Sequence, residues 1–248
     1  MTARMLDVAF TPAQAREAQV SVVIDVLRAT STIVQALAAG YRRVLCADGL
    51  DRARGVAAPA RVLAGERGCV RPAGFDLGNS PADTIPPRGD ELVLATTNGA
   101  PAIVRAAQLS PRVLIASLLN LDAVVVAIAG CEDVQLLCCG TDGRPALEDV
   151  YVAGRIAARL DRPKSDAALI AWAAAGAYPR ARDALADSLD AQVLRARGLG
   201  ADIDWCARES VVEFVPRARA VGEGVAAVAL AIDRDHPMGT AKYLAGSL

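Results

Sequence analysis

The stretch from Val20 to Gly40, VSVVIDVLRATSTIVQALAAG, constrains the fold more than any other part of the chain. Its first residues, Val20 to Ile24, are mostly β-branched and apolar, which predicts a strand that is covered on both faces of a sheet. The strand ends at Asp25. Apolar residues then recur at helical spacing up to Gly40, which can end a helix in a left-handed conformation. We therefore expect a strand, a polar corner and a helix in direct succession, as in α/β folds.

The corner after this strand carries four polar side chains, which are those of Asp25, Arg28, Thr30 and Ser31. Open α/β sheets bind their ligands at the carboxyl ends of strands, and the free N–H groups at the start of a helix attract negative charge. We therefore expect these side chains to line a ligand site, and we expect the ligand to be anionic.

The same succession of strand, small polar turn and helix is predicted at two further places. The strands are expected over Glu91–Ala95 and Val134–Cys138, and the small or polar residues of the turns are Thr97, Asn98, Gly99, Gly140 and Thr141. In a parallel arrangement all three turns lie along one edge of the sheet, where they can surround one ligand. Taken alone, the turn at Thr97 would fit an ordinary turn equally well.

A long segment from Gly65 to Pro87 shows neither helical nor strand periodicity. Irregular segments of this length inside a compact domain are usually functional or disordered, and the mixture of charged, aromatic and amide side chains here does not indicate disorder. We interpret the segment as a site loop. The alternative is a surface loop in which Ser80, Pro81 and Asp83 only begin a helix. The candidate site residues of this loop are Glu66, Arg67, Asp76, Asn79 and Ser80.

The order of the expected elements favours one α/β domain over residues 1–248, with three layers, a mainly parallel or mixed sheet, and helices on both faces. Strand and helix patterns alternate through about the first 160 residues, so a subdivision near that point is also compatible with the sequence. Further strands are expected over Arg43–Ala47, Arg61–Ala64 and Val113–Ala116.

The pattern changes in the last third of the chain. Ser165–Arg197 is alanine-rich and should form two helices, separated at Tyr178 and Pro179. Asp202–Pro216 places two aspartates before a tryptophan and should then continue as a strand that ends in Phe-Val-Pro. Beyond it we identify only an apolar segment near Val225–Ile232.

Charge and composition exclude several classes of protein. A formal net charge of −1 argues against neutralisation of nucleic-acid phosphates over a broad surface. No run reaches the roughly 18 apolar residues of a membrane helix, and Met1–Phe10 lacks the apolar block of a signal peptide. The six cysteines form no CxxC pair, and most lie in apolar runs, as reduced thiols do. We expect a cytoplasmic protein with a small-molecule partner, and a homodimer is compatible with the high apolar content.

The only histidine of the sequence is His236, so neither a histidine-rich zinc site nor a phosphohistidine mechanism is expected. Acid, base or metal chemistry then has to use carboxylates, whose hard oxygen atoms favour magnesium. Glu148 and Asp149 are two candidates at the start of an expected helix. Acids at this position stabilise a helix without any ligand, and successive helix residues point about 100° apart. One of the two could bind a metal while the other only caps the helix.

Cys138 and Arg144 have the cysteine, five residues, arginine spacing of cysteine-dependent phosphatases. In those enzymes the N–H groups of a turn lower the pKa of the thiol, and the arginine binds phosphate. However, Cys138 ends an apolar strand, no histidine precedes it, and Asp142 places a negative charge inside the loop. We therefore favour a buried structural role for Cys138 and keep the cysteine-dependent mechanism as an alternative.

The chain resembles the 2-phosphosulfolactate phosphatase family in six segments that follow in order from about Val20 to Pro216. They are VVIDVLRATSTI, AGERG, GFDLGNSP, TTNG, CCGTDGRPALEDV and the part from DIDWC to FVP. The family consists of magnesium-dependent phosphatases first placed in coenzyme M biosynthesis. The resemblance implies hydrolysis of phosphate monoesters of small anionic 2-hydroxy acids, with 2-phosphosulfolactate giving sulfolactate and phosphate. Ala100, Cys139 and Ala146 depart from the residues that the family usually carries.

A substrate with phosphate, carboxylate and sulfonate groups needs cationic groups, neutral donors and a metal around it. The catalytic candidates are Asp25 and Arg28. The candidates for substrate binding are Thr30, Ser31, Arg67, Asn79, Ser80, Thr97, Asn98, Gly99, Gly140 and Thr141. The candidates for magnesium binding are Asp25, Glu66, Asp76, Glu148 and Asp149.

Two roles stay open for Asp25. It could bind magnesium or orient the attacking water, which we slightly prefer, or it could attack phosphorus and form an aspartyl-phosphate. A non-catalytic module that binds a phosphorylated metabolite would need the arginines and helix ends but not the acids. A dinucleotide-dependent enzyme is the weakest interpretation, because no GxGxxG motif follows any expected strand.

Overall fold

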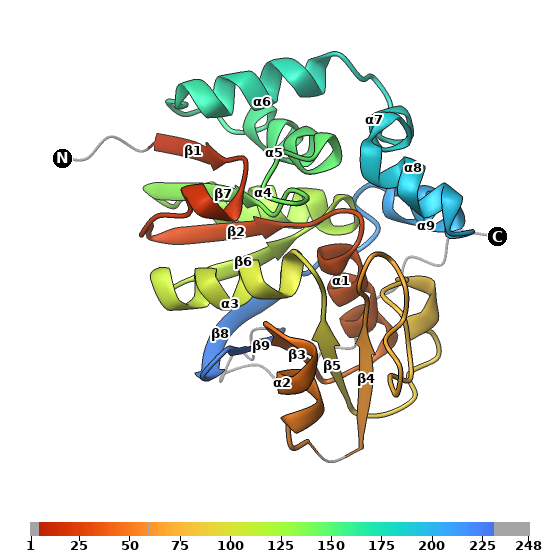
Figure 1. Cartoon of the computed structure of the whole chain (residues 1–248). Helices are drawn as coiled ribbons and strands as arrows, with labels where there is room; N and C mark the ends of the chain where they lie inside the picture. The colour runs from red at the N-terminus through yellow and green to blue at the C-terminus, as the bar shows by residue number, and fades with distance from the viewer. Residues whose placement is uncertain (1–4, 59, 231–248) are drawn as a thin grey trace.

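The computed structural model describes residues 5–58 and 60–230 (Figure 1). The strands are β1 (Met5–Ala9), β2 (Val20–Ile24), β3 (Arg43–Ala47), β4 (Arg61–Gly65), β5 (Glu91–Ala95), β6 (Val113–Ala116), β7 (Asp133–Cys138), β8 (Arg217–Gly222) and β9 (Val225–Ala229). The α-helices are α1 (Ala29–Ala39), α2 (Leu50–Gly55), α3 (Gly99–Leu109), α4 (Leu121–Ile128), α5 (Leu147–Ala158), α6 (Asp166–Gly176), α7 (Ala181–Asp187), α8 (Leu189–Ala196) and α9 (Ala201–Cys206). Short 3-10 helices are η1 (Pro12–Gln14), η2 (Ala82–Thr84) and η3 (Leu118–Asn120).

The described strands form one mixed sheet of nine strands in the order β1-β7-β2-β6-β8-β9-β3-β5-β4. It contains two parallel blocks, one of β1, β7, β2 and β6, and one of β3, β5 and β4. The β8–β9 hairpin joins the blocks through antiparallel pairs with β6 and with β3. Strand direction therefore reverses at each step from β6 to β3, and the two blocks run in opposite directions. The predicted α/β fold with a mainly parallel, mixed sheet is confirmed.

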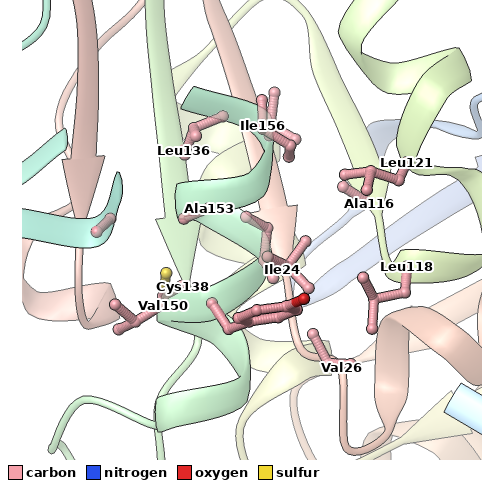
Figure 2. Packing of buried hydrophobic residues seen from close by; sticks show 14 of the residues in the cluster. Ile24, Val26, Ala116, Leu118, Leu121, Leu136, Cys138, Val150, Ala153 and Ile156 are labelled. Carbon is pink, nitrogen blue, oxygen red and sulfur yellow. The ribbon is translucent and has the colours of Figure 1, made fainter. Parts of the chain in front are cut away.

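Helices cover both faces of the sheet, as predicted. On one face, α1 and α3 pack against both blocks and the hairpin in a shared core cluster. On the other face, α4 and α5 cover the first block, whereas α2 covers β3 and β5. Figure 2 shows the first-block cluster, in which Leu136 of β7 and Ile24 of β2 meet Ala153 and Ile156 of α5.

The sheet is strongly twisted, so that its two blocks cross instead of lying flat side by side. In Figure 1, β2 runs across the view while β4 and β5 run vertically, and α1 and α3 lie between them. Contacts of α1 with both β6 and β3, and of α3 with both β2 and β3, agree with this arrangement. The twist matters for the site because it brings the carboxyl ends of β4 and β5 toward that of β2.

Two predictions for the last third of the chain are wrong in detail. Ser165–Arg197 forms three helices, because Ser188 accepts a hydrogen bond from the Ala191 N–H (3.1 Å) and starts α8 directly after α7. The predicted strand up to Pro216 is absent from the sheet. The residues that lead into it form α9, and residues 207–216, where the strand was expected, run along η3, where the N–H of Val212 donates to the Leu119 carbonyl.

Other predictions are met or remain open. Gly40 ends α1 with a φ of 114°, in the left-handed region that favours glycine, as expected. No helix in the described ranges is long and apolar enough to cross a membrane. His236 and the end of the apolar segment that begins near Val225 lie outside the described residues. The single domain and its subdivision near residue 160 stay predictions.

Candidate active site

A cavity of about 260 Å³ lies where strands of both blocks end and where α8 approaches them. The predicted site residues that line it are Asp25, Arg28, Glu66, Asn79, Thr97, Asn98 and Thr141. The cavity also contains Asp190 of α8, which the sequence analysis did not identify. Segments far apart in the sequence thus supply acids, an arginine and neutral polar groups to one space.

Two of the three predicted corners meet because β2 and β7 are parallel neighbours. Asp149, in the first turn of α5, ties them together: its Oδ1 accepts a hydrogen bond from the Val26 N–H (2.9 Å) and its Oδ2 from the Gly140 N–H (3.0 Å). Gly140 has a φ of 59°, and a Cβ there would lie 2.2 Å from the Arg144 carbonyl oxygen. This corner therefore requires glycine, and both oxygens of Asp149 already have backbone partners.

The third corner does not lie along the same edge, so that expectation is wrong. Thr97 follows β5, which belongs to the block of opposite direction. The twist of the sheet nevertheless brings the start of α3 against the first corner. A Cβ on Gly99 would lie 2.3 Å from Asp25 Oδ2 and 2.5 Å from the Ala29 Cβ, so only glycine fits between them.

Glu66, at the end of β4, fixes the loops on the second side of the cavity. Its Oε1 accepts a hydrogen bond from the Thr97 N–H (2.7 Å) and its Oε2 from the Cys69 N–H (2.9 Å). The side chain is buried. Glu66 therefore holds the ends of β4 and β5 in place while it contributes negative charge to the cavity.

Asp25 is buried at the corner between β2 and α1, with its Oδ1 accepting a hydrogen bond from the Ala29 N–H (3.0 Å). Its Oδ2 accepts no hydrogen bond from the described residues. The pKa of Asp25 is raised to about 7, first by burial and then by the charges of Glu66 and Asp190, although the Ala29 N–H and the charge of Arg28 oppose the shift. Asp25 can therefore gain or lose a proton near neutral pH.

Thr30 and Ser31 are fully buried and shape the corner from inside. The Thr30 hydroxyl donates to the Asp25 carbonyl (2.7 Å), and the Ser31 hydroxyl donates to the Val26 carbonyl (2.8 Å). Neither side chain lines the cavity. They hold the backbone around Asp25, and their predicted part in substrate binding stays a prediction.

Arg28 is held by an aspartate that the sequence analysis did not select. Its Nη1 donates to Asp202 Oδ2 (2.6 Å), and the Ser80 hydroxyl donates to Asp202 Oδ1 (2.6 Å). The side chains of Arg28 and Asp202 are 2% and 6% exposed, so the pair is shielded from water. Ser80 lines a neighbouring cavity with Arg28 and not the cavity that contains Asp25.

Asp190 reaches the cavity from the first turn of α8 and accepts a hydrogen bond from the Thr141 hydroxyl (2.5 Å). Beyond this contact a second cavity of about 600 Å³ adjoins the first, and Glu148 lines it. Glu148 Oε2 is buried and has no partner in the described part of the chain. Burial, with the charges of Asp149 and Asp190, raises the pKa of Glu148 well above its ordinary value.

Two predicted residues lie apart from the cavity. Asp76 is exposed, accepts a hydrogen bond from the Leu63 N–H (2.8 Å), and lines the neighbouring cavity beside Ser80. Arg67 donates to the carbonyl of Glu66 (2.7 Å) and does not line the cavity. The structure thus brings Asp25 and Glu66 together but leaves Asp76 outside.

The acids around the cavity fit one mode of magnesium binding. No group of three or more histidine, cysteine or acidic side chains among the described residues is arranged to hold a metal ion by itself. Magnesium in phosphoryl-transfer sites, however, is usually bound by one or two carboxylates, with waters and the substrate phosphate as the other ligands. Asp25, with its unpartnered Oδ2 and its repulsion from Glu66 and Asp190, fits either such a ligand or a group that orients the attacking water.

Cys138 lies in the hydrophobic core and not in the cavity. Figure 2 shows its sulfur beside Val150, in the cluster that also contains Leu136. Burial raises the pKa of the Cys138 thiol well above its ordinary value, and the charges of Asp149 and Glu148 raise it further. A thiol in this environment is a poor nucleophile, which supports its structural interpretation.

Comparison with known proteins finds relatives that match most of the chain. The family described as 2-phosphosulpholactate phosphatase matches residues 8–220 of the chain. A probable 2-phosphosulfolactate phosphatase of Thermotoga petrophila is 38% identical over 216 residues, which cover 86% of this chain and 94% of the relative. Proteins of the same description from Pseudothermotoga lettingae (38% over 218 residues, 86% and 95% covered) and Deinococcus radiodurans (37% over 238 residues, 92% and 94% covered) are also similar.

Proposed function

The chain belongs to the 2-phosphosulfolactate phosphatase family and is a phosphoric monoester hydrolase, and from this premise we propose that it hydrolyses 2-phosphosulfolactate to sulfolactate and phosphate with magnesium as its cofactor. The observation that carries the proposal is the meeting of Asp25, Glu66 and Asp190 with Arg28 in one cavity. Acids for a cation and a guanidinium for oxyanions are what a phosphate ester requires.

Arg28 is the group that binds the substrate's negative oxygens. Among the described residues, Arg28 donates a side-chain hydrogen bond only from Nη1, to Asp202. The N–H donors of Nη2 and Nε are therefore available to an oxyanion. The buried ion pair holds the guanidinium in one orientation, which favours bidentate binding of phosphate or sulfonate. Asn79, whose buried Oδ1 has no partner among the described residues, and Asn98 add neutral polar groups.

Asp25 orients the attacking water and takes up its proton. Its pKa of about 7 gives a carboxylate basic enough for this step at neutral pH. The water oxygen bonds to phosphorus while the bond between phosphorus and the ester oxygen breaks. The proton that Asp25 takes up passes to the ester oxygen, so the products are phosphate and the 2-hydroxy acid, and Asp25 returns to its charged form. When bound, magnesium supplies positive charge beside the phosphoryl oxygens.

The proposal is tested by measuring phosphate release from phosphosulfolactate, phospholactate, phosphoglycolate and phosphoglycerate. We expect the highest kcat/KM for phosphosulfolactate, loss of release with a chelator, and recovery when magnesium is added back. Release from only one of the other esters would mean that the proposed substrate is wrong. Release that persists with chelator would mean that magnesium is not the cofactor. No release from any of the four would contradict the whole proposal.

The cytoplasmic location and the homodimer complete the proposed function but rest on the sequence. The location is supported by the cysteines, all six of which are free thiols. The proposed partner is the small phosphate ester alone, in keeping with a net charge of −1. The oligomeric state can be measured directly by light scattering.

A further inference from the structure

Another cavity, of about 500 Å³, lies at the opposite edge of the sheet from the candidate active site. It is next to Arg43 and Val113, which begin β3 and β6, whereas Asp25 follows the end of β2, the parallel neighbour of β6. The two cavities share no lining residue. This cavity at the opposite edge is lined by four arginines, which are Arg43, Arg112, Arg217 and Arg219.

The sheet register places three of these arginines on one face. Arg217 lies opposite Ala229 and Arg219 opposite Ala227 in the β8–β9 ladder. Arg43 precedes Val44, which lies opposite Val228, so Arg43 is level with Ala229. Alternate residues of a strand and cross-strand neighbours share a face. The alanines therefore form a shallow apolar floor, with guanidinium groups around it.

The described helices cover this face of the hairpin only in part, because Ala227 is buried in the cluster that contains α2 but the rest of the face is open. Ala218 and Val228 point to the other face, where they belong to the core cluster that contains α3. On the cavity side, α4 and α5 cover the first block and α2 covers β3 and β5. The hairpin lies between these two covered regions, and Arg217 and Arg219 are exposed there.

The positive charge of the cavity is poorly compensated. Arg43 forms an ion pair with Glu91 (2.6 Å), but Arg42 shares the same carboxylate (2.9 Å). The side chains of Arg217 and Arg219 form neither a hydrogen bond nor an ion pair within residues 5–58 and 60–230. One carboxylate thus neutralises only part of the guanidinium charge around this space, which gives the cavity a positive potential.

Arg112 adds a buried donor. Its Nη1 donates to the Cys131 sulfur (3.3 Å) and its Nη2 to the Ala127 carbonyl (3.1 Å), which are both neutral acceptors. Its Nε is buried and has no partner among the described residues. An unpaired buried donor is costly, and an anion in the cavity would supply the missing negative charge.

We propose that this cavity binds a small organic polyanion, with two or more carboxylate or phosphate groups on a compact carbon body. The spaced guanidinium groups match several oxyanions, and the alanine floor accepts the apolar part of the ligand. The volume is in the range of small-molecule sites. The site is separate from the one that hydrolyses the phosphate ester.

The test is titration calorimetry of the full chain at low ionic strength, with citrate as the carboxylate probe, methylenediphosphonate as a stable stand-in for phosphate groups on a carbon body, and acetate as the monovalent comparison. We expect binding of at least one polyanion, weakening with added salt, and no detectable binding of acetate. The stronger of the two probes identifies whether carboxylates or phosphates are preferred. Failure of both polyanions to bind would overturn the proposal.

Two charge reversals locate the site. Arg217→Glu should weaken polyanion binding by tenfold or more, while Arg105→Glu, an exposed arginine on α3 at the other face of the hairpin, should change it by less than twofold. Both positions are exposed, so equal melting temperatures without ligand are expected and should be checked first. Equal weakening in both variants, or none in Arg217→Glu, would contradict binding at this cavity.

Discussion

The Arg28 guanidinium lies 2.6 Å from the carboxylate of Asp202, a residue 174 positions later in the chain. This contact joins the corner after β2 to the first turn of α9, and Ser80 of the long loop donates to the same carboxylate. Three distant segments are thereby fixed around one guanidinium. The orientation of Arg28 in the candidate active site thus depends on the helical segment between α5 and β8.

Asp202→Asn should lower both stability and activity. The substitution removes the negative charge and leaves the buried Arg28 charge without compensation, which typically costs about 3–5 kcal/mol. Denaturant unfolding should show this loss, and KM should rise because Arg28 is released. Asp204→Asn is the matched control: Asp204 lies in the same helix, but its ion pair with Arg182 is exposed (58% and 65%), so its loss should cost less than about 1 kcal/mol. Similar effects of the two substitutions would contradict a special role for Asp202.

Gly99→Ala should abolish most phosphate release while the protein still folds. The added Cβ would lie 2.3 Å from Asp25 Oδ2, so the Asp25 carboxylate or the start of α3 has to move. Overpacking of this kind costs about 1–3 kcal/mol. The control is Gly176→Ala at the end of α6, where an added Cβ meets no atom within 4 Å. Wild-type kcat/KM in Gly99→Ala would show that the Asp25 position tolerates displacement.

The strands of both parallel blocks could largely be predicted because their apolar, β-branched runs are local signals. The β8–β9 hairpin was missed: β8 has the sequence RARAVG, in which arginine alternates with alanine and no β-branched run occurs. The opposite direction of the two blocks depends on pairing of β8 with β6 and of β9 with β3. Such long-range pairing leaves no signal in a single segment, so the expected common edge was wrong.

The candidate site could likewise be predicted only where its residues follow a local sequence pattern. Asp25, Glu66 and Thr141 follow strands, and the carboxyl end of a strand is a position that sequence patterns reveal. Asp190 and Asp202 lie in first turns of short helices, where an acid has a sufficient local explanation in the helix dipole. Their approach to the cavity arises from helix packing. For Asp202, the only sequence feature that could have indicated a place in the site was its position in the DIDWC segment.

Cys138→Ser should leave phosphate release nearly unchanged and lower the stability. The thiol is fully buried among apolar side chains, and a hydroxyl in its place costs about 1–3 kcal/mol without a good partner. The measurements are kcat/KM and the urea midpoint, with Cys138→Ala as a second variant that carries no polar atom. Loss of turnover in both folded variants would reverse the structural interpretation and favour a thiol nucleophile.

Stability at acid pH should depend on Glu91. Burial acts to raise its pKa, but hydrogen bonds and charges from Arg43 and Arg42 outweigh it and lower the pKa below the ordinary value. A lowered folded-state pKa contributes stability above the unfolded-state pKa, and this contribution is lost as pH falls through the folded-state pKa. Glu91→Gln should therefore be less stable than the wild type at pH 7, and it should lose less stability than the wild type on acidification. Glu223→Gln, at an exposed position, is the control and should follow the wild type. Urea midpoints between about pH 7 and pH 3 measure both effects.

The acid limb of activity should report the protonation of Asp25. Its pKa of about 7 is set by burial first and then by the charges of Glu66 and Asp190. In metal-free protein labelled with 13C at aspartate, the carboxyl signal of Asp25, identified by its absence from Asp25→Asn, should therefore titrate near neutral pH. Asp190→Asn removes a like charge, so this midpoint should move to lower pH, and the acid limb of kcat/KM should move in the same direction. Asp187→Asn removes an exposed acid just before α8 starts and should leave the midpoint in place. A midpoint near 4 for the Asp25 signal itself would show instead that Asp25 is charged throughout the neutral range, and that its part in the reaction is to bind a cation and not to accept a proton.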